Sequence, residues 1–505
     1  MALNLLAVAN LLELVLINIM IVMKINKKSL NMKLDHKALF PKLTCLLMPV
    51  LSVSLLSVSI QSFANSSMLV PASEHLVLRD IQKDVQAERL KSDVTTLVNF
   101  GTRHTLSDTK SDTRGIGAAR RWIKSEFEKI AKECGGCIEV ITQSQTFSGE
   151  KRIPEPTEVM NVIAIQRGST DPNRYIVMSG DIDSRVTDPL DFTSDSPGAN
   201  DNATGVAGVI EAARVLSKYK FNGTVVYAAL SGEEQGLFGG KIMAEQAIKD
   251  NWRVEAVINN DMIGNISGIN GVINNTTARV FSEGIRYVET AEDAKIRRFS
   301  GGEVDSSSRN LARYIDTIAD KYIPNLDIMM VYRLDRFARG GHHRPFNQVG
   351  FPAVRIMETN EDYTRQHQDL REEGGIDYGD VLAGVDFDFT AKLTSLNAVT
   401  MASLAWAPAP PANVDIKGAV QASTTLSWTK PEGKQAQNLA GYRVYWRLTT
   451  DAQWSHSQYV GNVDSFILEN IVIDNYFFGV SSVSKDGFES PVVFPGPAGA
   501  FGGYK

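Results

Sequence analysis

The chain has 505 residues, of which 43% are hydrophobic and 22% are charged, a composition typical of a globular protein. This length exceeds one ordinary domain and predicts two or three. A net charge of -6 and a pI near 5.8 give no electrostatic case for a nucleic-acid partner, so we expect none.

The N-terminal region has the features of a secretory signal peptide. A unit starting at Met32 carries three lysines, continues through an apolar run at 46–60 and ends at Ala64 in a small-x-small pattern. A basic start, a short apolar region and such an ending predict cleavage after Ala64. We therefore predict that residues 1–64 are a targeting region and that the protein is secreted or periplasmic.

A second apolar stretch, at 2–23, precedes this unit and is followed by lysines. Two such units in series are unusual, and we interpret residues 1–31 as the product of an upstream start codon. The alternative is a membrane anchor at 2–23, which is long enough to span a bilayer. Glu13 in the middle of the stretch counts against this alternative.

Cysteine usage agrees with export. Cys134 and Cys137 form a Cys-Gly-Gly-Cys pattern, and Cys45 lies in the targeting region, so the mature chain keeps an even pair. In an oxidising compartment this pair can form a local disulfide. A redox-active pair is the alternative, although no thioredoxin-like pattern surrounds it.

Predicted helices and strands alternate through a domain that we place at 65–405. Periodicity predicts helices at 80–90, 93–98, 117–132, 204–219, 241–249, 309–321 and 381–404. Short apolar runs predict strands at 138–142, 159–166, 175–179, 224–230, 254–259 and 353–357. This alternation predicts an α/β fold with a mostly parallel sheet.

The C-terminal part has a different pattern. Residues 406–412 are rich in proline and alanine and predict a linker. Short alternating strands follow within 413–505 and predict an all-β sandwich. Through Trp428, Tyr442 and Tyr476 this stretch resembles a fibronectin type III module. The resemblance implies a spacer, or a module that contacts the cell surface or a polysaccharide, and no catalysis.

Two adjacent carboxylates, Glu233 and Glu234, follow the predicted buried strand at 224–230. Side chains one residue apart point to opposite faces of a strand. At the end of a strand, one can therefore bind a metal while the other faces a substrate. Metal-assisted hydrolysis needs such a pair, one as ligand and one as general base. A solvated acidic loop is the alternative for an isolated pair.

Four further polar motifs favour the metal-binding interpretation over the solvated acidic loop. They are Gly180-Asp181-Ile182-Asp183-Ser184, the loop 198–205 (Gly-Ala-Asn-Asp-Asn-Ala-Thr-Gly), Asn260-Asp261-Met262 and Arg365-Gln366-His367-Gln368-Asp369. Three of them follow predicted strands, and 198–205 leads into a helix. Carboxylates and imidazoles at the ends of neighbouring strands can converge on one crevice. Two metal ions about 3.5–4 Å apart need a bridging carboxylate with ligands on either side.

Together the five motifs make residues 80–400 similar to the zinc exopeptidase family of bacterial leucyl aminopeptidases and glutamate carboxypeptidase. The resemblance implies a three-layer α/β/α sandwich with a mixed sheet. It also implies two divalent metal ions, expected to be Zn²⁺. Glu233 would be the general base, which takes a proton from the attacking water and passes it to the leaving amine.

The resemblance also assigns the metal ligands by position. Asp201 would bridge both ions, Asp181 and Asp261 would complete one site, and Glu234 and His367 would complete the other. Asp183, which lies two residues from Asp181 on the same strand face, would support the site without binding metal.

Asp181 departs from the family pattern, in which a histidine is usual. The site formed by Asp181, Asp201 and Asp261 then has only oxygen ligands, which favour harder metals such as Mn²⁺ or Mg²⁺. We expect this site to bind metal weakly or to prefer a metal other than zinc. Asp183 would repel Asp181 unless a donor intervenes. A site that has lost its function is the alternative.

Three other histidines are candidates for a place in the site. His343 fits a family loop usually written Asp-His-x-Pro-Phe and is expected to line the site near the tetrahedral intermediate, while His342 takes the place of the aspartate. Loop packing is the alternative for both. His104 is expected to be structural or to face the substrate.

These features predict an exported metal-dependent aminopeptidase that acts on peptides with a free N-terminus. One alternative is a glutaminyl cyclase on the same fold, which usually works with one zinc. Another is an inactive surface-binding protein. The sequence has no Gly-x-Ser-x-Gly elbow, no phosphate-binding glycine loop and no His-Glu-x-x-His.

Overall fold

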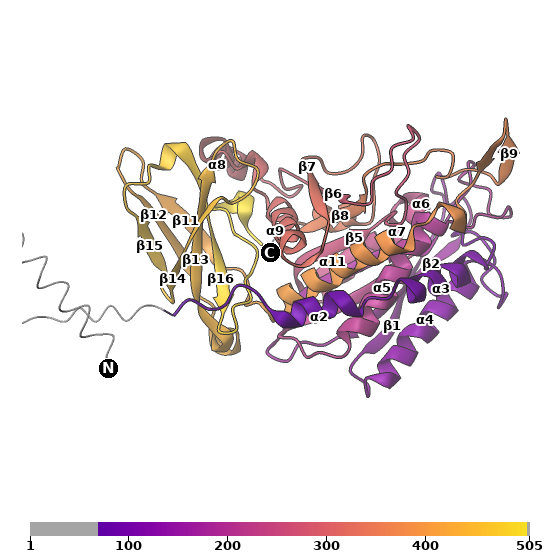
Figure 1. The fold of residues 1–505 in the computed structure, drawn as a ribbon, viewed down its shortest axis with the longest axis horizontal. Coiled ribbons are helices and arrows are strands. Elements are labelled where there is room, and N and C mark those ends of the chain that lie inside the picture. Colours follow the sequence, from indigo (N-terminus) through magenta and orange to yellow (C-terminus); the bar gives the residue numbers. More distant parts are fainter. Residues whose placement is uncertain (1–68, 502–505) are drawn as a thin grey trace, which may run out of the picture. The chain divides into compact units, whose positions relative to one another are not determined.

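An eight-stranded mixed sheet forms the centre of the larger part of the chain (Figure 1). The computed structural model describes residues 69–501. The strand order is β1-β2-β4-β3-β5-β8-β6-β7, with parallel pairing among β4, β3, β5 and β8. The strands are β1 (Glu139–Phe147), β2 (Thr157–Gln166), β3 (Asp171–Asp181), β4 (Gly223–Leu230), β5 (Arg253–Asn260), β6 (Thr277–Ser282), β7 (Asp327–Val331) and β8 (Ala353–Glu358). The predicted α/β fold is confirmed.

Helices cover both faces of this sheet, which makes the three layers. On one face lie α2 (Leu76–Asp84), α3 (Ala87–Val98), α4 (Gly115–Glu133), α5 (Thr204–Leu216), α9 (Ser307–Tyr322) and α11 (Phe387–Trp406). On the other lie α7 (Phe238–Lys249) and α10 (His343–Gln348).

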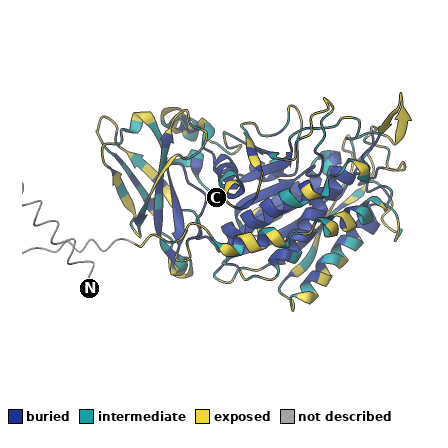
Figure 2. Ribbon diagram, in the orientation of Figure 1, coloured by how far each residue is buried: buried dark blue, intermediate teal, exposed yellow. Residues whose placement is uncertain are grey.

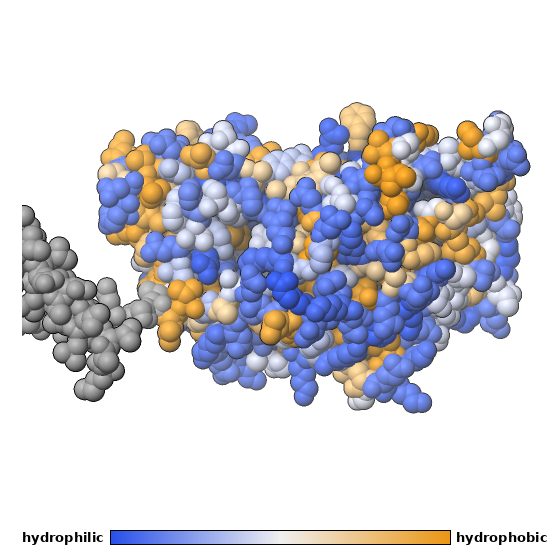
Figure 3. Space-filling view, in the orientation of Figure 1, coloured by the Kyte–Doolittle hydropathy of each residue, from blue (hydrophilic) through white to orange (hydrophobic). Residues whose placement is uncertain are grey.

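The short apolar run 175–178 in the middle of β3 is covered on both faces. Ile176 and Met178 pack against the first group of helices, and Tyr175 and Val177 pack against the second. A strand covered on both faces has no polar alternation. Figure 2 shows this buried centre, and Figure 3 shows mainly hydrophilic residues over the outer helices α2 and α3.

The last helix of this sheet region begins later than predicted. We expected it to start at 381, whereas α11 starts at Phe387. The side chain of Asp386 accepts a hydrogen bond from the backbone N–H of Phe389 at 2.8 Å and thereby caps the helix. Residues 382–384 form a short 3₁₀ turn instead. The prediction of the start was wrong because apolar periodicity ignored this cap.

The C-terminal region is an all-β sandwich, as predicted. Its two antiparallel sheets have the orders β11-β12-β15 and β14-β13-β16. The strands are β11 (Ala412–Lys417), β12 (Thr424–Thr429), β13 (Leu439–Leu448), β14 (His456–Gly461), β15 (Ser465–Leu468) and β16 (Tyr476–Ser484). Trp428, Tyr442 and Phe478 belong to the core between the sheets. The finer resemblance to fibronectin type III stays a prediction.

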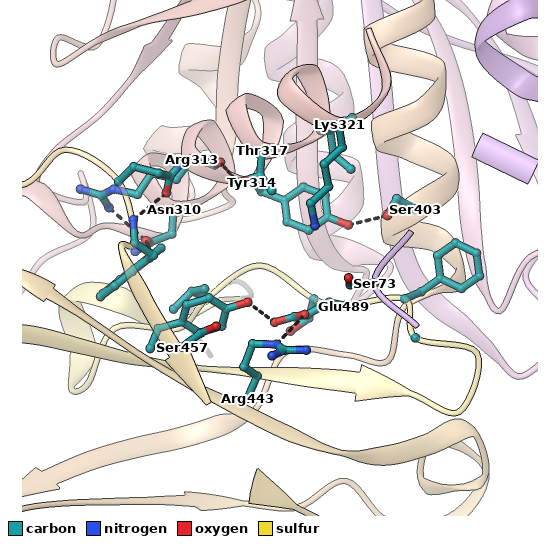
Figure 4. A pocket seen from close by; sticks show the side chains of 18 of the residues that line it. Ser73, Asn310, Arg313, Tyr314, Thr317, Lys321, Ser403, Arg443, Ser457 and Glu489 are labelled. Atoms are coloured by element: carbon teal, nitrogen blue, oxygen red, sulfur yellow. Dashed lines mark hydrogen bonds and ion pairs between the residues drawn. The ribbon is translucent and has the colours of Figure 1, made fainter. Parts of the chain in front are cut away.

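A buried ion network joins this β module to α9. Asp305 pairs with Arg447 of β13 at 2.8 Å and with Arg313 of α9 at 2.8 Å, and all three side chains are buried. A pocket of about 320 Å³ lies beside the network (Figure 4), where Arg443 pairs with Glu489 at 3.2 Å. The module is therefore packed against the sheet domain through specific polar contacts.

We expect Asp305→Ala to lower the free energy of unfolding by about 3–5 kcal/mol, because it leaves two guanidinium groups buried without their carboxylate. Urea denaturation measures this change. Asp320→Ala, at an exposed position of α9, is the control and should change stability by less than about 0.5 kcal/mol. Equal effects of the two substitutions would contradict the role given to the network.

Cys134 and Cys137 are joined by a disulfide, which is the first of the two alternatives that the sequence left open. Within residues 69–501, no helix combines the length and the apolar character that crossing a membrane requires. The predicted targeting region at 1–64 and the alternative anchor at 2–23 lie outside the residues that the structure describes.

Candidate metal centre

The sheet brings the predicted ligands to one edge. Asp181 ends β3, Asp261 follows β5, and Glu234 lies in the short helix α6 (Glu233–Gly236) directly after β4. These three strands are mutually parallel, so their carboxyl ends meet. His367 reaches the same edge from the loop after β8.

The side chains of Asp201, Glu234 and His367 lie close together. Nε2 of His367 lies 2.9 Å from Oε1 of Glu234 and 3.0 Å from Oδ2 of Asp201. One ligand atom from each lies within 4.8 Å of the others. One nitrogen and two carboxylate oxygens suit a zinc ion that keeps an open position for substrate. The residues present therefore fit one divalent ion.

The electrostatics of this cluster also suit a cation. Burial lowers the pKa of His367, but the carboxylates of Glu234 and Asp201 outweigh burial and raise it to about 9. In the metal-free protein the imidazole at neutral pH therefore carries a proton between two carboxylates. Metal ligation requires that this proton leave.

Neighbouring residues hold the three side chains in place. Arg185 donates from Nε to Oε2 of Glu234 at 2.7 Å, and one of its terminal nitrogens lies 2.6 Å from Nδ1 of His367. The backbone N–H groups of Asn200 and Asp201 donate to the carboxylate of Asp380. The peptide bond between Asp201 and Asn202 is cis. Such outer contacts orient metal ligands and tune their affinity.

Glu233 lies beside this cluster, and its carboxylate forms no hydrogen bond or ion pair with any of residues 69–501. It is half-buried and lines the same cleft as Asp201, Glu234 and His367. Burial raises the pKa of Glu233, and the neighbouring carboxylate of Glu234 raises it further. A carboxylate with a raised pKa is a better proton acceptor, as a general base needs to be.

Asp183 supports the turn that carries both glutamates. Its Oδ1 accepts from the backbone N–H of Glu233 and its Oδ2 from that of Glu234, both at 3.1 Å. It therefore fixes the backbone of Glu233 and Glu234 at this turn. The repulsion with Asp181 that the sequence suggested remains: burial raises the pKa of Asp181, and the carboxylate of Asp183 raises it further.

The second predicted site is arranged differently. Oδ1 of Asp181 lies 2.5 Å from Nδ1 of His342, and its Oδ2 accepts from Asn202 at 2.7 Å. Asp261 pairs with the buried guanidinium of Arg355 at 2.9 Å. Donors and a cation thus engage both carboxylates, and in the described part of the chain they do not join Asp201 in a ligand group. As arranged, these residues do not fit a second metal ion, and the two-ion prediction stays a prediction.

His342 and Asp181 are the two positions at which the sequence departs from the family pattern, and they contact each other. A histidine and a carboxylate are thus both present at this point, with the side chains exchanged between the two positions. The contact joins residues 161 positions apart, so the sequence alone did not reveal it.

The two other histidines are buried and contact backbone carbonyl groups. His343 is fully buried, and its Nε2 lies 2.8 Å from the carbonyl oxygen of Leu334. It is not among the residues that line the cleft, which favours the packing alternative. His104 is buried with Nε2 3.0 Å from the carbonyl oxygen of Pro189, which agrees with a structural role.

Sequence reasoning missed Arg185 and Arg355. Arg185 directly follows the Asp-Ile-Asp-Ser motif, so its position at a strand end was a usable signal. Arg355 lies inside β8, where an arginine in an apolar strand indicates a buried charge that needs carboxylate partners.

Known proteins resemble this chain over most of its length. The model of "Peptidase family M28" matches residues 161–379. A "Probable zinc metalloprotease" of Pyrenophora teres f. teres is 43% identical over 433 residues, which cover 85% of this chain and 89% of that protein. A protein of Pyricularia oryzae with the same description is 42% identical over 418 residues, covering 82% and 83%.

A solved structure shares the fold. The crystal structure of LapA from Legionella pneumophila superposes with a TM-score of 0.50 at 19% identity. The superposition covers 67% of this chain and 79% of that chain. At this identity the likeness concerns the fold alone.

Proposed function

Since the chain belongs to peptidase family M28 and is therefore a metallopeptidase, we propose that it is an aminopeptidase that releases N-terminal residues from peptides. One observation carries this proposal. Glu233, an uncommitted carboxylate, lines the same cleft as the ligand group of Asp201, Glu234 and His367. Metal-assisted hydrolysis needs a proton acceptor beside the metal-binding group.

Asp201, Glu234 and His367 would hold a zinc ion. When bound, the ion polarises the scissile carbonyl and makes a water molecule more acidic. Glu233 accepts the proton of the attacking water and delivers it to the leaving amine. The hydrogen bonds to Asp183 hold the backbone of Glu233 and Glu234 in place during this transfer. Asp261 also lines the cleft, where Arg355 pairs with its carboxylate at 2.9 Å.

A second candidate, a glutaminyl cyclase, is favoured by one specific observation. The structure gathers ligands for one ion, and a one-zinc centre is usual for that enzyme. Both reactions use a metal and a carboxylate that moves a proton. The products differ, because cyclisation releases ammonia and leaves the peptide at full length.

Mass spectrometry of peptide products separates these candidates. Zinc-loaded protein should shorten a peptide with a free N-terminus and leave its N-acetylated twin intact. A peptide with N-terminal glutamine that loses only ammonia would identify the cyclase. If the peptide with a free N-terminus and the peptide with N-terminal glutamine both stay unchanged, the proposed aminopeptidase activity is wrong.

We further propose that the protein is exported. The signal-like segment that ends at Ala64 and the disulfide between Cys134 and Cys137 support this. N-terminal sequencing of the mature protein should then begin at Asn65. The β module remains our candidate for contact with the cell surface or a polysaccharide.

A further inference from the structure

Five arginines line the cleft beside the metal centre, whose volume is about 240 Å³. They come from separate segments of the chain: Arg152 between β1 and β2, Arg185 after β3, Arg336 and Arg339 after β7, and Arg344 in α10. Four carboxylates line the same cleft, so the arginines outnumber the carboxylates by one.

Three of these arginines are committed to the protein itself. Arg185 pairs with Glu234 at 2.7 Å, and Arg336 pairs with Glu361 at 2.7 Å. Arg152 donates to the backbone carbonyl of Glu234. These contacts hold the walls of the cleft and give each of the three arginines a partner within the protein, although Nε of Arg336 is itself buried without a hydrogen-bond acceptor.

Arg339 and Arg344 have no such explanation. Neither forms an ion pair with any carboxylate among residues 69–501. Arg339 is exposed, whereas Arg344 is half-buried and its Nε is buried without a hydrogen-bond acceptor. A buried donor without an acceptor is costly. An acceptor supplied by a bound molecule would remove this cost.

From these two arginines we infer that the cleft selects peptides with a carboxylate close to the scissile bond. Guanidinium groups bind carboxylates with two parallel hydrogen bonds, and the cleft excludes part of the competing water. The carboxylate can belong to an aspartate or glutamate side chain, or it can be the C-terminus of a short peptide. The inference rests on the proposed aminopeptidase function and names its substrate class.

Three pairs of dipeptides, each differing by one carboxylate, test this inference. They are Asp-Ala-amide against Asn-Ala-amide, Ala-Asp-amide against Ala-Asn-amide, and Ala-Ala against Ala-Ala-amide. We expect kcat/KM to be about tenfold higher for the acidic member of at least one pair, which corresponds to about 1.4 kcal/mol. The pair that shows the preference identifies the source of the carboxylate.

Variants then assign the preference to the two arginines. The double variant Arg339→Gln/Arg344→Gln should bring the acidic-to-neutral ratio close to one, and Arg339→Lys/Arg344→Lys should keep part of it. Arg298→Gln removes a positive charge from an exposed position of α8 (Ala291–Ser300), away from the cleft, and should leave the ratio unchanged. Added salt should reduce the ratio, because exposed charges are screened.

Calorimetric binding of the same peptide pairs to Glu233→Gln protein makes the test independent of turnover. Tighter binding of an acidic member supports the inference even if no peptide is hydrolysed, in which case only the proposed function fails. Ratios near one in all pairs, in both turnover and binding, overturn the inference. A preference that the double glutamine variant keeps would overturn it as well.

Discussion

Glu233→Gln should lower kcat for peptide hydrolysis by about a thousandfold, within the range for loss of a general base. The amide has nearly the shape of the carboxylate but cannot accept the proton of the attacking water. Because Glu233 is not in the ligand group, the variant should bind as much zinc as the parent protein. Steady-state kinetics and metal analysis of the same samples measure both effects.

Glu155→Gln is the matched control for this substitution. Glu155 lies in an exposed loop, so the same chemical change there should leave kcat within about twofold of the parent value, as for surface changes of small effect. If Glu233→Gln kept more than a tenth of the parent kcat, another group would have to move the proton.

His367→Ala should weaken zinc binding by at least about a hundredfold. Loss of a residue that only supports a ligand already costs 10–100-fold, and His367 offers the only nitrogen in the cluster. The substitution also leaves Glu234 and Asp201 facing each other without the imidazole between them. Competition against a chromophoric chelator measures the change in affinity.

His456→Ala on the β module is the control for His367→Ala, because His456 is exposed on β14 and far along the chain from the cleft. It should bind zinc like the parent protein. Retention of one zinc equivalent by His367→Ala after dialysis against the chelator would show that the ion is held elsewhere.

The sequence predicted those features that local patterns determine. Strand β3 and helix α5 are visible as apolar periodicity, and the carboxyl ends of parallel strands must meet. Asp201, Glu234 and His367 therefore converge although His367 is more than 130 residues from Glu234. Family resemblance supplied the proposed roles of these residues but not the contacts around them.

Features that depend on loop placement were not predictable in this way. Whether His342 would reach Asp181 depends on the path of the segment between β7 and α10. Arg355 belongs to an apolar strand, and only the fold shows that its guanidinium lies against Asp261. These contacts weigh against a second metal ion beside Asp181 and Asp261, because they supply positive charge and hydrogen-bond donors where a cation was expected.

Anomalous diffraction at the zinc absorption edge tests the metal centre most directly. Crystals of zinc-loaded protein should give one strong peak about 2.0–2.2 Å from ligand atoms of Asp201, Glu234 and His367, the usual zinc distances. A peak next to Asp181 and Asp261, with none next to Asp201, Glu234 and His367, would contradict this assignment of the metal centre.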